Sequence, residues 1–238
     1  MQPAHIISAD FGRHNKDLSK SASRIIQSGT WKEQSVIMLI PADRLVPAKA
    51  ALSWMNLIFP PNNKAFRMLA LGTEVGVAYS QMIEQILAHP DLSTWKFILT
   101  VEHDNIPPPD GLLMLIEAME QHPELSAIGG LYWTKGEGGV PQIWGDPRGE
   151  VLNFRPQPPV PNQLVECCGT GMGFTLFRMD MFKDKRLRRP WFRTVREAGG
   201  MMTQDLYFWE DARRHNHRCA IDCRVLVGHY DVQNDIIW

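Results

Sequence analysis

Short runs of consecutive apolar residues recur along the first half of the chain, at Ser35–Ile40, Phe66–Leu71 and Trp95–Val101. Such runs are typical of strands that are buried on both faces of a parallel sheet. Between them, apolar residues repeat at helical spacing, which predicts helices over 48–58 and 75–88. Strands that alternate with helices in this way indicate an α/β fold with a parallel sheet.

The second half continues this pattern less regularly. Its predicted elements are a helix after the prolines at 107–109, strands over 127–133, 174–177 and 219–227, a loop over 156–161 and a helix over 206–214. Residues 1–34 are polar and weakly periodic, so we expect them to form an N-terminal arm or leading element. The remaining residues, 35–238, have a length that suits one domain with one core.

Composition and charge are those of an ordinary soluble globular protein. Of the 238 residues, 44% are hydrophobic and 21% are charged, and the formal net charge is -1, so an anionic partner would have to meet a local basic patch. No run of about 18 apolar residues occurs and the N-terminus lacks the pattern of a signal peptide, which predicts a cytoplasmic protein without a membrane partner. The spacing of the four cysteines fits a zinc site poorly and favours buried free thiols.

Two carboxylates follow the predicted strand that ends at Val101. Glu102 and Asp104 lie one residue apart at the strand end, where ligands bind in open α/β sheets. From there both can contribute oxygen ligands to a hard divalent cation that also binds a diphosphate. The alternative is a solvated acidic turn, or capping of the next helix by Asp104 or Asn105.

Several segments, taken in order, resemble the motifs of GT-A glycosyltransferases, in particular the inverting, family-2-like group. The segments that carry the resemblance are 36–43, 75–81, 96–104, 168–177, 203–209 and 227–229. This resemblance implies a single GT-A domain, that is, a Rossmann-like nucleotide-sugar-binding domain with a mostly parallel central sheet. It also implies transfer of a sugar from a nucleotide-sugar, most simply a UDP-sugar, to a hydroxyl acceptor.

The same resemblance implies a metal and a donor pocket. Glu102, Asp104 and His229 correspond to the ligands of an Mn²⁺ or Mg²⁺ ion, which neutralises the departing diphosphate. The residues implied for donor binding are Pro41, Ala42, Asp43, Ser80, His103 and Lys135. The sequence departs from the family at Ser80 and Gln81, where an arginine and an asparagine usually lie near the diphosphate.

Asp205 corresponds to the catalytic carboxylate of the family, with Gln204 in place of the usual glutamate before it. In an inverting enzyme this carboxylate takes the proton from the acceptor hydroxyl as the hydroxyl attacks the sugar. The alternative for Asp205 is a helix N-cap.

The acceptor side is predicted at aromatic, glycine-rich and basic positions. These positions are Tyr132, Trp133, Trp144, Gly169, Thr170, Gly171, Gln204, Arg188, Arg189 and Trp191. Glycine permits close approach of backbone to a sugar, and indole rings offer apolar surfaces to it. The alternatives are a tight turn or β-bulge for the glycines and core packing for the tryptophans.

Residues 183–196 form a local basic cluster that encloses Trp191 and Phe192. In GT-A folds this interval is a mobile loop on the acceptor side, so a cationic version would suit a polyanionic acceptor such as DNA, with the two aromatic rings stacked on bases. A small soluble transferase with such a loop resembles viral DNA-modifying glycosyltransferases, which would act in the host cytoplasm. This resemblance favours a hydroxymethylated base in DNA as acceptor; the alternative is a solvated surface loop.

Other functions are compatible with the same residues. The acceptor could be a carbohydrate or a protein, or the domain could be a sugar-binding or nucleic-acid-binding module without catalysis, for which Ser80 and Gln204 are the best support. A nucleotidyltransferase would also use paired carboxylates and a metal. It normally needs a glycine-rich loop after the first strand, and residues 40–44 contain no glycine.

Overall fold

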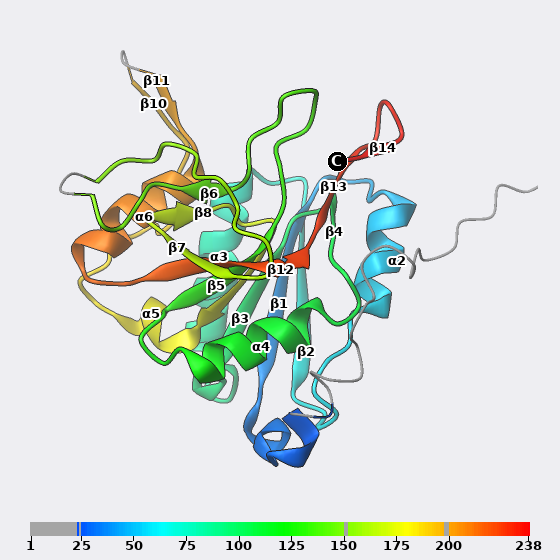
Figure 1. Ribbon diagram of the computed structural model, residues 1–238. Coiled ribbons are helices and arrows are strands. Elements are labelled where there is room, and N and C mark those ends of the chain that lie inside the picture. The colour runs from blue at the N-terminus through cyan, green and yellow to red at the C-terminus, as the bar shows by residue number, and fades with distance from the viewer. Residues whose placement is uncertain (1–22, 24, 150–151, 198–199) are drawn as a thin grey trace, which may run out of the picture.

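A seven-stranded sheet with the strand order β2-β1-β3-β9-β5-β12-β7 forms the centre of the protein (Figure 1). The structure is a computed structural model and describes residues 23, 25–149, 152–197 and 200–238. Most of the expected arm, 1–34, lies outside these residues. Its described end adds Ile25 to the core and forms a short 3-10 helix, Thr30–Glu33.

Three parallel strands make up one side of the sheet. They are β1 (Val36–Ala42), β2 (Ala65–Leu71) and β3 (Phe97–Val101). β1 pairs with both of the others in parallel register, and all its residues are buried. Its apolar run therefore forms the buried type of strand that the sequence predicts. β2 lies at the sheet edge and is more exposed.

The other side of the sheet combines parallel and antiparallel strands. These are β5 (Ala127–Leu131), β12 (Cys219–Leu226), β9 (Phe174–Arg178) and β7 (Leu164–Cys167). β5 and β12 are parallel to each other, whereas β9 is antiparallel to both β3 and β5, and β7 is antiparallel to β12. The sheet is mostly parallel in direction because only β9 and β7 run against the others.

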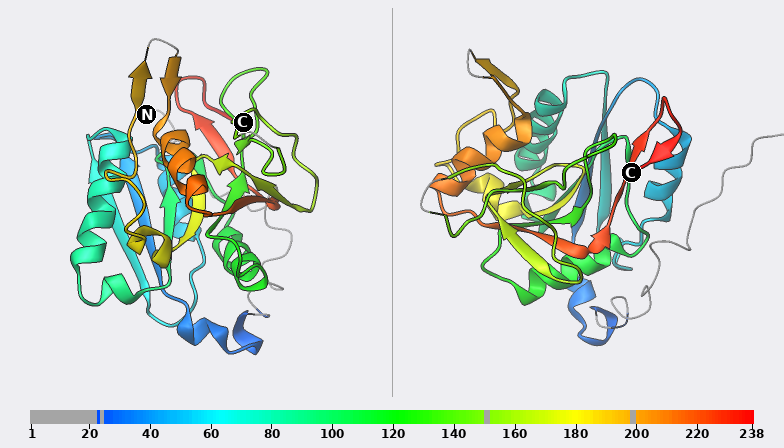
Figure 2. Two further views of the ribbon diagram at one scale, coloured as in Figure 1. Left: turned by 90° about the vertical axis from the view of Figure 1, so that its left-hand side faces the viewer. Right: turned by 45° about the horizontal axis from the view of Figure 1, so that its top comes forward.

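Helices cover both faces of the sheet (Figures 1 and 2). The helices are α2 (Ala48–Asn56), α3 (Val75–Ala88), α4 (Gly111–Gln121), α5 (Met179–Lys183) and α6 (Gln204–Arg214). Buried side chains of α3, α5 and α6 belong to one hydrophobic cluster, and those of α2 and α4 belong to a second cluster. The sheet separates the two clusters, which gives the protein three layers.

Short elements surround this core. They are β4 (Asn105–Ile106), β6 (Ile143–Trp144), β8 (Gly169–Thr170), β10 (Val195–Glu197), β11 (Gly200–Met202), β13 (Gly228–Asp231), β14 (Ile236–Ile237) and a 3-10 helix, Leu92–Thr94. β4 pairs with β13, and β13 pairs with β14. β10 and β11 form a hairpin that projects from the body of the protein (Figure 1).

The main helices and strands predicted from the sequence are confirmed, with two differences and several additions. The strand at 174–178 is antiparallel to its neighbours, and the last predicted strand ends at Leu226 because the chain leaves the sheet and pairs with β4. The sequence patterns predicted neither β7 nor the hairpins. The four cysteines are buried free thiols, as predicted. No helix in the described part of the chain is long and apolar enough to span a membrane.

Candidate functional site

A pocket of about 200 Å³ lies beyond the carboxyl ends of β1 and β3. Its lining residues are Pro41, Ala42, Asp43, Val75, Glu102, His103 and Asp104. All six residues that were predicted for the donor and the metal on segments 41–43 and 102–104 therefore line one pocket. Strand ends at this edge of an α/β sheet are the usual place for a ligand.

Asp104 is at the centre of the polar contacts beside this pocket. Its side chain is only 13% exposed; it forms an ion pair with Lys135, and its Oδ2 lies 3.5 Å from His229 Nε2. Burial alone would raise the pKa of Asp104, but hydrogen bonds with His229 and Lys135 hold that pKa well below its usual value. Asp104 is therefore ionised at neutral pH and available to a cation.

His229 reaches Asp104 because β13 pairs with β4. In this antiparallel pair His229 is opposite Asn105, the residue after Asp104. His229 Nδ1 lies 2.7 Å from the carbonyl oxygen of Trp133. A carbonyl can only accept a hydrogen bond, so Nδ1 carries a proton, and Nε2 faces Asp104 with either a second proton or a lone pair.

Glu102 is half-buried beside Asp104 and is held by the backbone of the turn. Its N–H donates to the carbonyl of Gly173 at 3.3 Å, and its own carbonyl accepts from Asn105 N–H at 3.0 Å. Burial, together with the charges of Asp104 and Asp205, raises the pKa of Glu102 to about 8. At this pKa, which already includes the opposing charge of Lys135, Glu102 is mainly protonated at neutral pH when no metal ion is bound.

Asp205 lies in the first turn of α6 and is buried. Its Oδ1 accepts hydrogen bonds from Thr203 Oγ1 and from Leu206 N–H, the latter at 2.9 Å. Burial raises the pKa of Asp205 although these hydrogen bonds oppose the shift. The N-cap of α6 is Thr203, so Asp205 is not the capping residue that the sequence also allowed, although its side chain accepts a hydrogen bond from a backbone N–H of the first turn. The negative charge of Asp205 also acts on Glu102.

The donor atoms at Asp104 and His229 suit a divalent cation. Among the described residues, no three His, Cys, Asp or Glu side chains already converge as a metal centre. Two adjacent ligands of an octahedral cation with bonds of about 2.1 Å lie about 3 Å apart, so the 3.5 Å between Asp104 Oδ2 and His229 Nε2 needs little adjustment. The ammonium group of Lys135 already forms an ion pair with Asp104, in the place where a metal ion would bind. The described residues therefore do not assemble the predicted three-ligand site of Glu102, Asp104 and His229; of these, Asp104 and His229 lie close enough together to share a cation.

Of the three acceptor-side residues predicted on the basic segment, Trp191 is contradicted by the structure, Arg188 is held by other side chains and Arg189 remains exposed. Trp191 is 1% exposed and packs against Phe182, so it cannot stack on a base without unfolding. Arg188 stacks on the Tyr207 ring and pairs with Glu210, which anchors it to α6. Arg189 is exposed but lies over the Trp191 ring.

Ser80, predicted to bind the donor, is buried in the interface between α3 and the segment after Pro190. Its Oγ accepts from Phe192 N–H at 3.2 Å and donates to the Phe192 carbonyl at 3.4 Å. Phe192 itself is buried among Tyr79 and Phe208. The role of Ser80 is therefore structural, because both of its hydrogen-bonding capacities are used inside the protein.

The glycine-rich segment also faces the interior. A Cβ on Gly171 would lie 2.1 Å from Tyr132 Oη, and one on Gly169 would lie 3.0 Å from Trp209 side-chain atoms. Thr170 is fully buried, and its carbonyl accepts from Trp209 Nε1 at 2.8 Å. The prediction that these residues and Tyr132 contact the acceptor directly is wrong; the glycines admit neighbouring aromatic side chains instead.

The remaining predicted acceptor residues are half-buried. Trp133 uses its carbonyl to orient His229, which is a positioning role that the sequence did not indicate. Trp144 lies in β6, pairs with Gly169 and donates to Gln142 Oε1 at 3.2 Å. Gln204 lies at the start of α6, where its Cβ approaches Gly76 of α3.

Two residues of the site, Val75 and Thr203, were not predicted from the sequence. Val75 lines the pocket from the start of α3, and Thr203 donates to Asp205. Threonine is a common residue at a helix N-terminus, and Thr203 lies just before the predicted helix 206–214, so this signal could have identified it. Val75 carried no signal beyond its place in an apolar helix.

The sheet and its flanking helices define the protein as an α/β chain of Rossmann-like type with a mostly parallel central sheet. Among solved structures, the crystal structure of A197 from STIV shares this fold, with a TM-score of 0.60 over 86% of this chain and 93% of that chain, at 15% sequence identity. No protein family matches the chain, and no curated protein matches it either. At this identity, the similarity to A197 shows the fold alone.

Proposed function

We propose that this protein is a glycosyltransferase that moves a sugar from a nucleotide-sugar to a hydroxyl acceptor, with a GT-A arrangement of its site. One observation carries the proposal: Glu102, Asp104, Lys135 and His229 all follow the carboxyl ends of parallel strands, and they meet beside the pocket formed by β1 and β3. Asp205 enters the same electrostatic cluster from α6.

In this proposal the nucleotide occupies the pocket beside Pro41, Ala42 and Asp43, and its diphosphate extends toward Asp104 and Lys135. Asp104 and His229, joined by Glu102, would hold an Mn²⁺ or Mg²⁺ ion. When bound, that ion supplies Lewis-acid stabilisation of the departing diphosphate. Lys135, which pairs with Asp104 in this structure, would then be free to form an ion pair with a phosphate oxygen of the donor.

Asp205 is the proposed general base. Both side-chain hydrogen bonds that it accepts from the described residues fall on Oδ1, so Oδ2 is the oxygen that would take the acceptor proton. Its raised pKa brings its basicity closer to neutral pH than that of an exposed aspartate. The acceptor oxygen then attacks the anomeric carbon while the bond from that carbon to the diphosphate breaks, and the configuration is inverted.

The first acceptor to test is a hydroxymethylated base in DNA. Lys185, Arg189 and Arg193 are exposed on the basic segment, so a local cationic surface remains although Trp191 is part of the core. Carbohydrate and protein acceptors are the alternatives. A binding module without catalysis would bind the donor and release no diphosphate.

The decisive experiment combines activity with binding. Purified protein is tested for hydrolysis and transfer with a panel of nucleotide-sugars, with Mn²⁺ and with a chelator, and UDP binding is measured by calorimetry. Asp104→Asn should abolish turnover and weaken Mn²⁺-dependent UDP binding at least tenfold, whereas the exposed control Asp180→Asn should change neither. Unchanged UDP and Mn²⁺ binding by Asp104→Asn would contradict the proposed site.

A further inference from the structure

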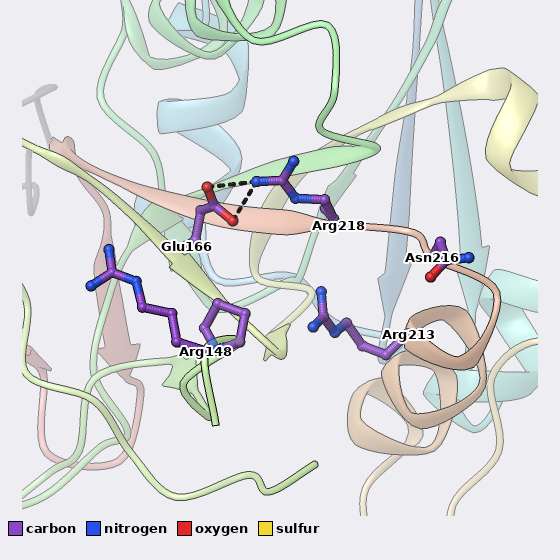
Figure 3. Close-up of a pocket in the computed structure, with 6 residues that line it drawn as sticks. Arg148, Glu166, Arg213, Asn216 and Arg218 are labelled. Carbon is purple, nitrogen blue, oxygen red and sulfur yellow. Dashed lines mark hydrogen bonds and ion pairs between the residues drawn. The ribbon is translucent and has the colours of Figure 1, made fainter. Parts of the chain in front are cut away.

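A second pocket, of about 320 Å³, lies at the opposite end of α6 from Asp205 (Figure 3). Its lining residues are Pro147, Arg148, Glu166, Arg213, Asn216 and Arg218. Arg213 is eight residues after Asp205 on the same helix, so the two are about 12 Å apart along its axis. This arginine pocket is therefore separate from the proposed donor site.

Four different segments contribute to the arginine pocket. Arg148 follows β6, Glu166 lies in β7, Arg213 lies in the last turn of α6, and Arg218 directly precedes β12. The antiparallel pairing of β7 with β12 places Glu166 beside Arg218. No sequence pattern indicated this pocket, because Arg148 and Glu166 are far from Arg213 and Arg218 in the chain.

The charges in this pocket do not balance. Arg218 Nη2 donates to both carboxylate oxygens of Glu166 at 2.7 Å, so Glu166 satisfies this one arginine. Arg148 and Arg213 have no ion-pair partner in the part of the chain that the structure describes. Arg213 Nε is, in addition, buried without a hydrogen-bond partner there, and a buried donor without an acceptor is costly.

We propose that the arginine pocket binds the dianion of a phosphate monoester. Three arginines and one glutamate leave two positive charges, which match a dianion and exceed what a single carboxylate ligand would neutralise. Guanidinium groups bind phosphate oxygens through paired N–H donors, and Arg213 Nε gains its missing acceptor in this arrangement. The volume is at the lower end of the range for small-molecule sites, roughly 300 to 1,000 Å³, which suits a phosphate with a small organic group.

The first test is calorimetric titration of the full chain with inorganic phosphate at neutral pH and constant ionic strength. Arg148→Gln and Arg213→Gln should each weaken phosphate binding at least tenfold. Arg214→Gln is the matched control, because Arg214 is on the same turn of α6, is 60% exposed and already pairs with Glu210. It should bind phosphate like the parent.

A second set of measurements separates a built site from general attraction of anions. Glu166→Gln should bind phosphate more tightly than the parent, since the resident carboxylate no longer competes for Arg218. Acetate should bind at least tenfold more weakly than phosphate. Near-ultraviolet circular dichroism checks the fold, and Arg148→Gln, an exposed loop position, keeps the test valid if Arg213→Gln is unstable.

The proposal is overturned if Arg148→Gln and Arg213→Gln bind phosphate like the parent, if Arg214→Gln loses as much affinity as they do, or if acetate binds as tightly as phosphate. Competition with ribose 5-phosphate, and with an oligonucleotide that carries a 5′-phosphate or a 5′-hydroxyl, assigns the source. Preference for the phosphorylated oligonucleotide over ribose 5-phosphate supports a nucleic-acid end, and equal competition supports a small metabolite. None of these outcomes depends on sugar transfer.

Discussion

Glu102 shows how a single residue carries the electrostatic character of the proposed site. Its pKa is about 8 in the folded protein against 4.5 for an ordinary glutamate, because of burial and the neighbouring aspartates. Between these two pH values, the folded metal-free protein binds more protons at Glu102 than the unfolded chain does. We therefore expect this residue to make the free energy of unfolding fall as pH rises from 4.5 to 8 and to add no further slope above 8.

The measurement is urea unfolding in the presence of a chelator across this pH range. Glu102→Gln cannot titrate, so its stability should depend less on pH than that of the parent. The exposed Glu33→Gln is the control and should keep the parental slope. Equal slopes for the parent and Glu102→Gln would show that Glu102 has an ordinary pKa.

Trp191 gives a second prediction at this scale. Because its indole is fully buried, Trp191→Ala should lower the free energy of unfolding by about 3 to 5 kcal/mol. The exposed neighbour Arg193 serves as control, and Arg193→Ala should stay within about 0.5 kcal/mol of the parent. A Trp191→Ala variant that keeps its stability but loses DNA affinity would restore the surface role predicted from the sequence.

The residues of the candidate site were predictable to different degrees. Glu102 and Asp104 stand next to an apolar strand, so their position at the pocket follows from the sequence pattern. Trp191 lies among arginines in the sequence, and only its packing against Phe182 of α5 in the folded chain reveals that it belongs to the core. The arginines beside Trp191 in the sequence therefore did not indicate that its side chain is buried.

Helix α6 carries one residue of each proposed site, Asp205 in its first turn and Arg213 in its last, and the first turn leads to a prediction for catalysis. Asp205→Asn keeps the size of the side chain but removes the proton acceptor, so kcat should fall by about 10² to 10⁴ while donor affinity changes little. Steady-state kinetics and UDP calorimetry measure the two effects separately.

Asp211→Asn provides the matched control, since Asp211 lies on the same helix and accepts a hydrogen bond from Arg188 N–H instead of facing the pocket. It should retain turnover. Retained turnover in Asp205→Asn would exclude the general-base role, and an equal loss of donor affinity would point to a structural one.

The elements themselves were largely predictable, whereas their pairing was not. An apolar run such as 174–178 looks the same in a parallel and an antiparallel strand when both faces are buried, so the direction of β9 had no signal. β4 and β13 are too short for any periodicity, yet their pairing brings His229 to Asp104. These features depend on contacts between distant segments.

On the scale of the whole molecule, the exposed cations of the basic segment allow a test of the DNA hypothesis. If Lys185 and Arg193 contact phosphates, the logarithm of DNA affinity should fall linearly with the logarithm of salt concentration. The Lys185→Glu, Arg193→Glu double variant should bind more weakly and reduce this slope by about 0.9 for each lost contact.

The control for this salt series is Lys32→Glu, Lys64→Glu, which makes the same change in net charge on exposed lysines near the amino end of β1. It should keep the parental slope. If the two double variants behave alike, or if affinity does not depend on salt, the basic segment is ordinary surface and DNA is not the acceptor.

The position of β9 has a consequence for how the chain reaches its folded state. β9 lies between β3 and β5 but follows both in the chain. Until residues 174–178 leave the ribosome, the facing edges of β3 and β5 have no partner, and such open edges can pair with other nascent chains. Closing the sheet also requires a pairing between distant segments, which forms slowly. The late-translated strand β9 therefore protects the earlier strands β3 and β5 from pairing with other chains.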